Sequence, residues 1–388
     1  MYHRALEISN ALKRKSVFLL GPRQTGKSTL LRARFPDARY VDLLEADTFR
    51  ELSAFPESLR QRMTPRERLV IIDEIQKLPR LLDEVQLLID RNPQLRFLLT
   101  GSSARKLRHG NANLLGGRAL FHALHPLTSA EVGVARSLDL CQWGGLPAML
   151  DSPDPRADLN AYVGTYLKEE IQAESLSRSI ENFARVLHFA AHLNGQQVNY
   201  TKVGNDAQVP PRTVRDYFQV FQDTLIGYLL PPLAGTSRRK AVATEKFYFF
   251  DVGVARSLAR KGPLSHATPD FGEALEHLVF LELLAYRDYR DPDLDLTYWR
   301  TTSQLEVDFV LNREVAVEVK ASARVSPGDL KGIRALSEDL PLRRKLVVSG
   351  EPHERWVDDI RILPHQTFLE ELWSGALLGD HPQQPREP

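Results

Sequence analysis

Residues 21–28 read GPRQTGKS and match the phosphate-loop pattern G-x-x-x-x-G-K-[ST] at every position. They follow the apolar run SVFLL at 16–20 and begin a helical pattern, the context that confirms such a match. Glycines let successive backbone N–H groups point at phosphates, and the helix N-terminus adds a positive dipole end. The segment therefore predicts an α/β domain that binds ATP with Mg²⁺. The residues expected to bind the nucleotide are Gly21, Pro22, Arg23, Gln24, Thr25, Gly26, Lys27, Ser28 and Thr29.

A carboxylate pair forms the second element of this site. The apolar run LVII ends in Asp73 and Glu74, which places both at the C-terminal end of a parallel strand, where α/β sheets bind ligands. Lys27 is expected to meet the β- and γ-phosphates, and Ser28 and Asp73 to hold Mg²⁺. Glu74 is expected to act as the base that polarises the attacking water.

A further apolar strand, at 96–100, ends in the small residues TGSS. Thr100 and Ser102 are candidates to orient the attacking water or to sense the γ-phosphate. The alternative is that they are only turn or N-cap residues. With another strand at 39–43 and an amphipathic helix at 81–89, the pattern indicates a parallel sheet covered on both faces.

Composition sets the broader class. A chain of 388 residues predicts two to four domains at roughly 100–200 residues each. No apolar run reaches the ~18 residues that span a bilayer, so we expect no membrane contact. Cys141 is the single cysteine, which predicts a reducing, cytoplasmic location. A net charge of +1 excludes a uniformly basic nucleic-acid coat but leaves local basic patches possible.

The middle of the chain contains a helix-turn-helix pattern. Residues 199–207 and 213–224 read as two helices, and Arg212 and Arg215 project from the first turn of the second. That helix enters the major groove in DNA readers of this kind, so DNA is an expected partner. The alternative is a winged helix that serves as a spacer or protein contact. Further phosphate contacts are expected from Arg238, Arg239 and Lys240.

Near the C-terminus, EVDFVL and VAVEVK flank the tripeptide NRE and predict a hairpin. In that register Leu311 faces Val315 and Asp308 faces Glu318, and Lys320 shares their face. Opposed carboxylates repel each other. Either a divalent cation such as Mg²⁺ or Mn²⁺ lies between them, or Lys320 and other basic groups neutralise the pair.

Residues 15–135 resemble the AAA-type ATPases, most of all a prokaryotic branch. In that branch the strand ending Thr-Gly-Ser-Ser is followed by Gly-Arg and by Pro-Leu-(Thr/Ser)-x-x-Glu. Here these elements are GR at 117–118 and PLTSAE at 126–131, and WGGLP also resembles the group's Gly-Gly-x-Pro element. The resemblance implies an arginine finger offered to a neighbouring subunit, with Arg118 and Arg105 as rival candidates. It thus implies a homo-oligomer, such as a hexameric ring, that assembles with ATP.

Asp308, followed by Glu-x-Lys on the next strand and preceded by a helix carrying Glu276, resembles the PD-(D/E)xK nuclease-like fold. In that family the two strand carboxylates, here Asp308 and Glu318, hold a metal. The lysine, here Lys320, positions or activates water. ATPases of the branch named above commonly carry such a domain after a winged helix. The resemblance implies either a second Mg²⁺ or Mn²⁺ site capable of hydrolysis, or a structural or DNA-binding remnant.

These features predict an α/β fold in five parts. The parts are a P-loop NTPase core of AAA type (1–135), a helical linker or lid (136–195), a winged helix-turn-helix (196–240), an α+β restriction-endonuclease-like domain (241–375) and a disordered tail (376–388). The expected function is Mg²⁺-dependent ATP hydrolysis coupled to binding or remodelling of DNA. The alternative is an ATP-switched regulatory or defence protein whose C-terminal domain binds a protein partner.

Overall fold

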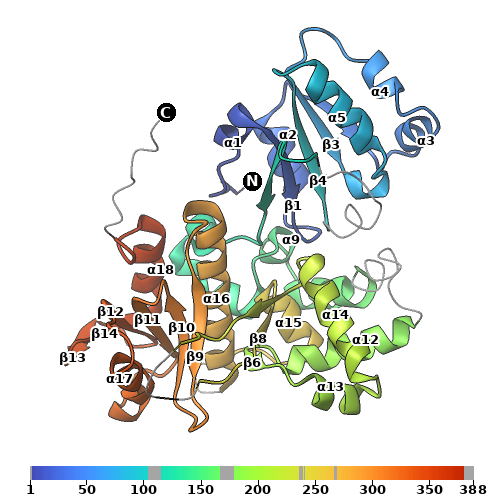
Figure 1. Ribbon diagram of the computed structural model, residues 1–388. Helices are drawn as coiled ribbons and strands as arrows, with labels where there is room; N and C mark the ends of the chain where they lie inside the picture. The colour runs from blue at the N-terminus through green and yellow to red at the C-terminus, as the bar shows by residue number, and fades with distance from the viewer. Residues whose placement is uncertain are drawn as a thin grey trace.

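The computed structural model describes residues 2–103, 115–166, 179–235, 239, 241–265 and 269–379. Figure 1 shows an N-terminal α/β part at the top, with a helical middle part and a C-terminal sheet part below it. Among the described residues, no helix combines the length and the apolar character needed to cross a bilayer.

The N-terminal part is built on a five-stranded parallel sheet of order β2-β3-β4-β1-β5. The strands are β1 (Ser16–Leu20), β2 (Arg39–Asp42), β3 (Leu69–Asp73), β4 (Arg96–Gly101) and β5 (Ala119–Ala123). The helices are α1 (Ser9–Arg14), α2 (Lys27–Arg34), α3 (Ala46–Ala54), α4 (Ser58–Gln61) and α5 (Leu81–Arg91), with a short 3₁₀ turn η1 (Ile75–Lys77) after β3. The predicted α/β fold with a parallel sheet is confirmed.

Burial on both faces explains why β1 contains no charged residue. Val17 and Leu19 pack with the core beneath α1 and α2, whereas Phe18 and Leu20 pack with the core beneath α3, α4 and α5. The sequence reading did not identify β5, because this edge strand is only half-buried and mixes polar and apolar residues.

The middle part contains several short helices and a three-stranded antiparallel sheet of order β6-β8-β7. Its helices are α7 (Ser129–Val132), η2 (Val134–Arg136), α8 (Ser137–Trp143), α9 (Pro147–Leu150), α10 (Pro155–Ala161), a π-helical turn (Tyr162–Tyr166), α12 (Ile180–His192), α13 (Tyr200–Ala207), α14 (Pro211–Asp223) and α15 (Val252–Leu258). Its strands are β6 (Gln196–Gln197), β7 (Gly227–Leu230) and β8 (Lys246–Phe249). Two consecutive helices, α13 and α14, occupy the segment for which a helix-turn-helix is predicted.

One sequence-based boundary was misplaced. We assigned β8 to the C-terminal part, but it pairs with β6 and β7. Phe247 and Phe249 of β8 then pack against Phe218 and Phe221 of α14. A strand separated from its partners by a long connection carries no local sign of which sheet it joins.

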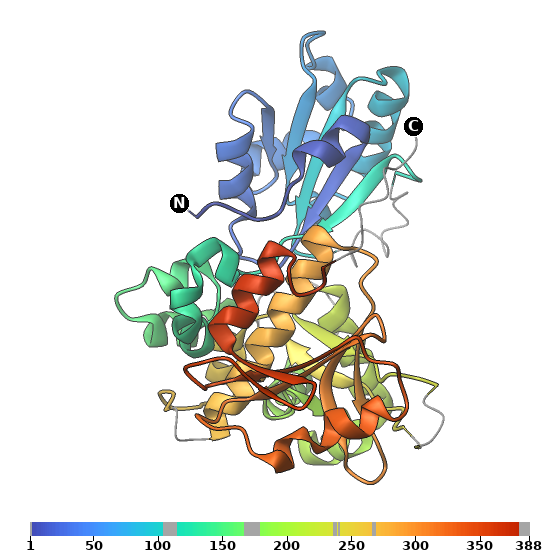
Figure 2. The same cartoon turned by 90° about the vertical axis from the view of Figure 1, so that its left-hand side faces the viewer.

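The C-terminal part is a six-stranded mixed sheet of order β13-β14-β12-β11-β10-β9. The strands are β9 (Leu296–Arg300), β10 (Glu306–Leu311), β11 (Val315–Lys320), β12 (Arg344–Ser349), β13 (Arg355–Val357) and β14 (Ile360–Pro364). Helices α16 (Pro269–Arg290) and α18 (His365–Ser374) pack on one face and lie side by side (Figure 2), and η4 (Pro327–Leu330) and α17 (Lys331–Ser337) pack on the other.

The predicted disordered tail begins too early. Leu377 is fully buried in the core beneath α16 and α18, and Arg344 donates hydrogen bonds to the carbonyls of Ala376 and Leu377. Residues 380–388 lie outside the described residues.

The WGGLP element joins the N-terminal and middle parts. A Cβ on Gly145 would lie 2.3 Å from the Leu127 carbonyl oxygen, and one on Gly144, where φ is +79°, would lie 2.1 Å from the Asp251 carboxylate. The Gly145 N–H donates to Asp251 at 2.7 Å, and the same carboxylate caps α15 by accepting from the Val254 N–H. Only glycines allow this close approach.

A buried carboxyl group joins the PLTSAE element to the C-terminal part. Glu282 of α16 accepts from the Ser129 N–H at 2.7 Å and from the Ser129 hydroxyl at 2.9 Å, and the Trp373 indole N–H donates to it as well. Burial raises the pKa of Glu282 to about 7 despite these hydrogen bonds.

Candidate functional site

The phosphate loop lies at the carboxyl end of β1. A Cβ on Gly21 would lie 2.5 Å from the Leu124 carbonyl oxygen, and Gly26 has φ +90°, so each position favours glycine. The buried Lys27 ammonium donates to the carbonyls of Gly21 at 2.7 Å and Pro22 at 3.0 Å. The Thr25 hydroxyl donates to the Pro22 carbonyl at 2.8 Å and fixes the curve of the loop.

Side chains from three other elements contact Asp73, the last residue of β3. Its carboxylate accepts from the Ser28 hydroxyl at 2.6 Å, from the Tyr40 hydroxyl and from the Thr100 hydroxyl. These side chains belong to α2, β2 and β4, while Asp73 ends β3. A hydroxyl beside a carboxylate is an oxygen donor set that suits Mg²⁺, so the residues present fit the ion that the phosphate loop implies.

Glu74 follows with φ +61°, a left-handed conformation that turns its side chain out of the strand direction. Its N–H donates to the Thr100 hydroxyl at 3.2 Å, and its carboxylate accepts from the Gln76 amide. Burial raises the pKa of Glu74, Lys27 opposes this shift, and Asp73 adds to it. A carboxylate with a raised pKa is better matched to accepting a proton near neutrality.

Thr100 contacts the acidic pair directly, whereas Ser102 contacts Gln76, which in turn donates to Glu74. Thr100 bridges the Asp73 carboxylate and the Glu74 N–H, and Ser102 accepts from the Gln76 amide at 3.2 Å. Both residues are buried. These hydrogen bonds hold the Asp73 carboxylate, the Glu74 backbone and the Gln76 amide in place.

Four residues at the site were not identified from the sequence. Gln76 and Tyr40 hold the carboxylates, as described above. Arg4 is buried and donates to the Thr25 carbonyl at 2.7 Å and to Glu131 at 2.9 Å. The Tyr162 hydroxyl lies 3.4 Å from the Arg23 carbonyl. Only the position of Gln76, two residues after the acidic pair, gave any local signal.

Arg118 lies just before β5, which runs parallel to β1. It is therefore at the amino ends of the strands, whereas the phosphate loop is at their carboxyl ends. Its guanidinium forms two hydrogen bonds with Asp90, at 2.7 and 3.2 Å. Arg118 therefore cannot reach the phosphate loop of its own subunit, and it could act only on a neighbour. The rival Arg105 lies outside the described residues.

The proposed DNA contacts fall into two groups. Arg212 and Arg215 are exposed on α14, and the Arg215 guanidinium lies 5.1 Å from the centre of the Tyr200 ring. Arg239 instead binds α17: it donates to the Ala335 carbonyl at 2.9 Å and to Glu338. Arg238 and Lys240 lie outside the described residues.

In the C-terminal part the hairpin has the predicted register, with Leu311 opposite Val315. Beyond Phe309 the ladder ends, and the Asp308 carboxylate accepts from the Val319 N–H at 2.8 Å. The Lys320 ammonium lies 2.5 Å from Glu318.

Three carboxylates, those of Glu276, Glu306 and Asp308, form an acidic cluster around Lys246, the first residue of β8. Its ammonium lies 2.6 Å from Glu306, 3.2 Å from Glu276 and 3.6 Å from Asp308, and its side chain is 3% exposed. Burial alone lowers the pKa of Lys246, but the facing carboxylates outweigh burial and hold the pKa well above its usual range. The structure thus favours neutralisation by lysine over a bridging cation. Within the described residues, no group of three or more His, Cys, Asp or Glu residues has a metal-binding arrangement.

The fold and the phosphate-loop geometry define the class of protein. Residues 13–133 match the family model described as AAA domain. The N-terminal part is therefore similar to AAA domains and has the parallel-sheet fold of a P-loop NTPase. Residues 136–265 and 271–368 match two further models, each described only as a domain of unknown function (DUF8612 and DUF4143).

The relatives extend along most of the chain. Uncharacterized proteins of Mycobacterium bovis and Mycobacterium tuberculosis are each 28% identical over 385 residues, covering 94% of this chain and 83% of theirs. An uncharacterized protein of Haemophilus influenzae is 24% identical and covers 69% of each chain. A solved Signal Transduction ATPase with Numerous Domains (STAND) protein with a tetratricopeptide repeat sensor, from Pyrococcus horikoshii, aligns with a TM-score of 0.24 and 13% identity. That alignment covers 74% of this chain and 49% of the solved one.

Proposed function

We propose that this protein hydrolyses ATP at the phosphate loop, with Mg²⁺, and that Glu74 is the general base. The observation that carries the proposal is the convergence of Ser28, Asp73 and Thr100 at the carboxyl edge of the sheet, beside Lys27. Ser28 and Asp73 would hold the magnesium ion, which when bound neutralises phosphate charge. Lys27 adds a point charge at the β- and γ-phosphates.

The remaining residues act through the acidic pair. Gln76 and Thr100 fix the carboxylate and the backbone of Glu74, so Glu74 can accept a proton from a water without first reorganising. The raised pKa of Glu74 strengthens it as a proton acceptor. Gln76 and Thr100 are positioning residues in this scheme.

The test compares nucleotide binding with turnover. Lys27→Ala should lose nucleotide binding, because it removes the charge that meets the phosphates. Glu74→Gln should bind ATP and fail to hydrolyse it, because the amide keeps the shape and loses the base. Asp37→Asn, an exposed carboxylate in the same domain, is the matched control and should keep wild-type turnover. Wild-type turnover by purified Glu74→Gln would refute the role of Glu74.

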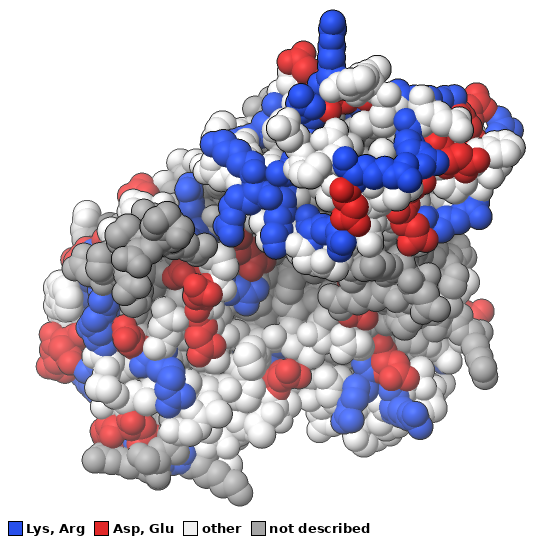
Figure 3. Space-filling view, turned by 45° about the horizontal axis from the view of Figure 1, so that its top comes forward, with Lys and Arg blue, Asp and Glu red and all other residues white. Residues whose placement is uncertain are grey.

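We further propose that the ATPase acts on DNA through α14. Arg212 and Arg215 support this, since both are exposed on the second helix of the helix-turn-helix unit. Figure 3 shows Lys and Arg side chains gathered over the parallel-sheet domain, with Asp and Glu among them. DNA should stimulate ATP turnover, and this should require Arg212 and Arg215. Unchanged turnover with every DNA tested would favour the alternative of an ATP-switched regulator that binds a protein partner.

A homo-oligomeric assembly completes the proposal. Arg118 lies at the amino ends of the strands, opposite to the phosphate loop of its own subunit, and this supports a role in a neighbouring subunit. Light scattering of the ATP-bound Glu74→Gln protein tests the assembly directly, and a strictly monomeric species would contradict it.

A further inference from the structure

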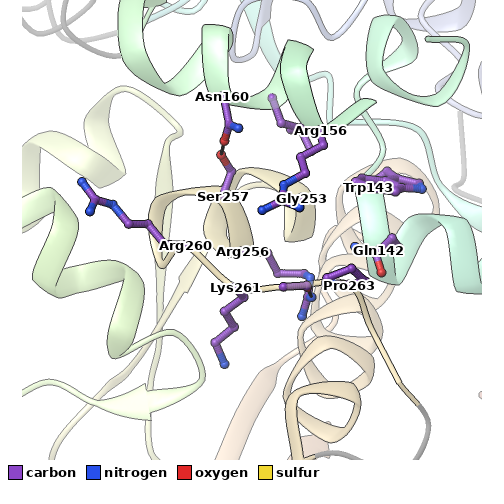
Figure 4. A pocket seen from close by; sticks show the side chains of 12 residues that line it. Gln142, Trp143, Arg156, Asn160, Gly253, Arg256, Ser257, Arg260, Lys261 and Pro263 are labelled. Atoms are coloured by element: carbon purple, nitrogen blue, oxygen red, sulfur yellow. Dashed lines mark hydrogen bonds between the residues drawn. The ribbon is translucent and has the colours of Figure 1, made fainter. Parts of the chain in front are cut away.

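A second pocket, of about 400 Å³, lies among α8, α10, α15 and the segment after α15, and none of its lining residues belongs to the phosphate loop. Figure 4 shows Arg156 and Asn160 reaching from α10 toward α15, with Trp143 of α8 at one side. This volume falls in the range of ~300–1,000 Å³ that is usual for small-molecule sites.

The walls of the pocket are fixed by close packing. A Cβ on Gly253 would lie 2.1 Å from the Trp143 carbonyl oxygen, so the first turn of α15 rests directly on the end of α8. Ser257 donates a 3.0 Å hydrogen bond to Asn160, which ties α15 to α10 (Figure 4). The pocket is therefore part of the folded architecture.

Arg256 is the unusual residue in this pocket. It is only 7% exposed, yet its guanidinium makes one hydrogen bond, from Nη2 to the Gly262 carbonyl at 2.5 Å. Its Nε and Nη1 atoms are buried and have no hydrogen-bond partner among the residues that the structure describes. Burial lowers the pKa of Arg256, although Asp270 and Glu273 oppose that effect. Unpaired buried donors cost free energy, and a turn of the Arg256 side chain toward an acceptor in the pocket would recover it.

The charge around Arg256 favours an anion. Four cationic side chains line the pocket, and within the described part of the chain only Lys261 of these forms ion pairs, with Asp270 at 2.9 Å and with Glu273. Arg156 and Arg260 form no ion pair with any described residue. Arginines arranged in this way suit a phosphate or carboxylate that accepts paired N–H bonds.

We propose that this pocket binds a phosphate-bearing small molecule of nucleotide size, at a site separate from the phosphate loop. Arg256 and Arg156 hold the phosphate group, and the Trp143 indole lines the pocket beside them. The site does not depend on ATP hydrolysis, so it stands even if the catalytic proposal fails.

The experiment uses the full chain carrying Lys27→Ala, to weaken binding at the phosphate loop. Inorganic phosphate and AMP are titrated separately while tryptophan emission and the thermal midpoint are recorded. Both probes should give saturable changes. Arg156→Gln and Arg256→Met should each weaken binding at least tenfold. Arg91→Gln, an equal charge change at an exposed position at the end of α5, should leave binding unchanged.

The variants also separate a binding role from a structural one. In phosphate-free buffer Arg256→Met should keep or raise the thermal midpoint, because it removes unpaired buried donors. If AMP binds more tightly than phosphate and Trp143→Phe removes the difference, the ligand is a nucleotide. Equal binding assigns the site to the phosphate group alone. Absence of binding, or binding that survives unchanged in both Arg156→Gln and Arg256→Met, would overturn the proposal.

Discussion

Replacing Lys246 with methionine tests how the acidic cluster of the C-terminal part is stabilised. Methionine keeps most of the apolar side chain and removes the ammonium that lies within 3.6 Å of Glu276, Glu306 and Asp308. Removing one partner of a buried ion pair leaves an uncompensated buried charge and costs ~3–5 kcal/mol. We therefore expect the free energy of unfolding to fall by about that amount at pH 8.

The loss should depend on pH in a defined direction. Burial raises the pKa of Glu276 above its usual value, and Asp308 adds to the shift, while Lys246 opposes it. Without Lys246 that pKa rises further. A raised carboxyl pKa contributes stability below the unfolded value that is lost as pH rises through the folded one. The deficit of the variant should therefore shrink between pH 8 and pH 5, measured by urea unfolding at each pH.

A matched control and a metal titration complete the test. Lys261→Met removes a more exposed lysine paired with Asp270 and Glu273, and should cost ~1 kcal/mol or less. Mn²⁺ should stabilise Lys246→Met by ~2.7 kcal/mol at one hundred times its dissociation constant, and leave the wild type unchanged. A pH-independent loss below ~1 kcal/mol would refute the reasoning. Equal stabilisation of the wild type by Mn²⁺ would restore the metal-site interpretation.

Three further predictions concern other parts of the chain. Burial raises the pKa of Glu282 to about 7. Its contribution to stability should therefore be present below its unfolded pKa and lost as pH rises through 7. Glu282→Gln should remove up to ~3 kcal/mol of that pH dependence, measured by urea unfolding at pH 5 and pH 8. If Arg118 acts in a neighbouring subunit, mixing Arg118→Ala with Lys27→Ala subunits should restore part of the ATPase activity, and no recovery would count against Arg118. If α14 meets DNA phosphates, replacing Arg212 and Arg215 together should flatten the plot of log affinity against log salt by up to ~0.9 per lost contact; an unchanged slope would remove α14 from the interface.

The sequence by itself determined the phosphate loop, the strands that end at it and the α/β class. These features depend on contiguous residues: glycines with special backbone needs, an apolar run buried on both faces, and polar residues at the point where each strand ends. The hairpin register was predictable for the same reason, since the length of its turn fixes which residues face each other.

Only the tertiary structure decided which distant residues complete each site. Lys246 reaches a carboxylate cluster on α16 and β10, Gln76 and Tyr40 fix the acidic pair, and Arg256 becomes buried because α8, α10 and α15 close around it. The local sequence around a charged residue does not show whether that residue will be buried, because its burial depends on elements many residues away. The position of Lys246 among the carboxylates and the second pocket therefore follow from packing, and no local sequence pattern predicts either.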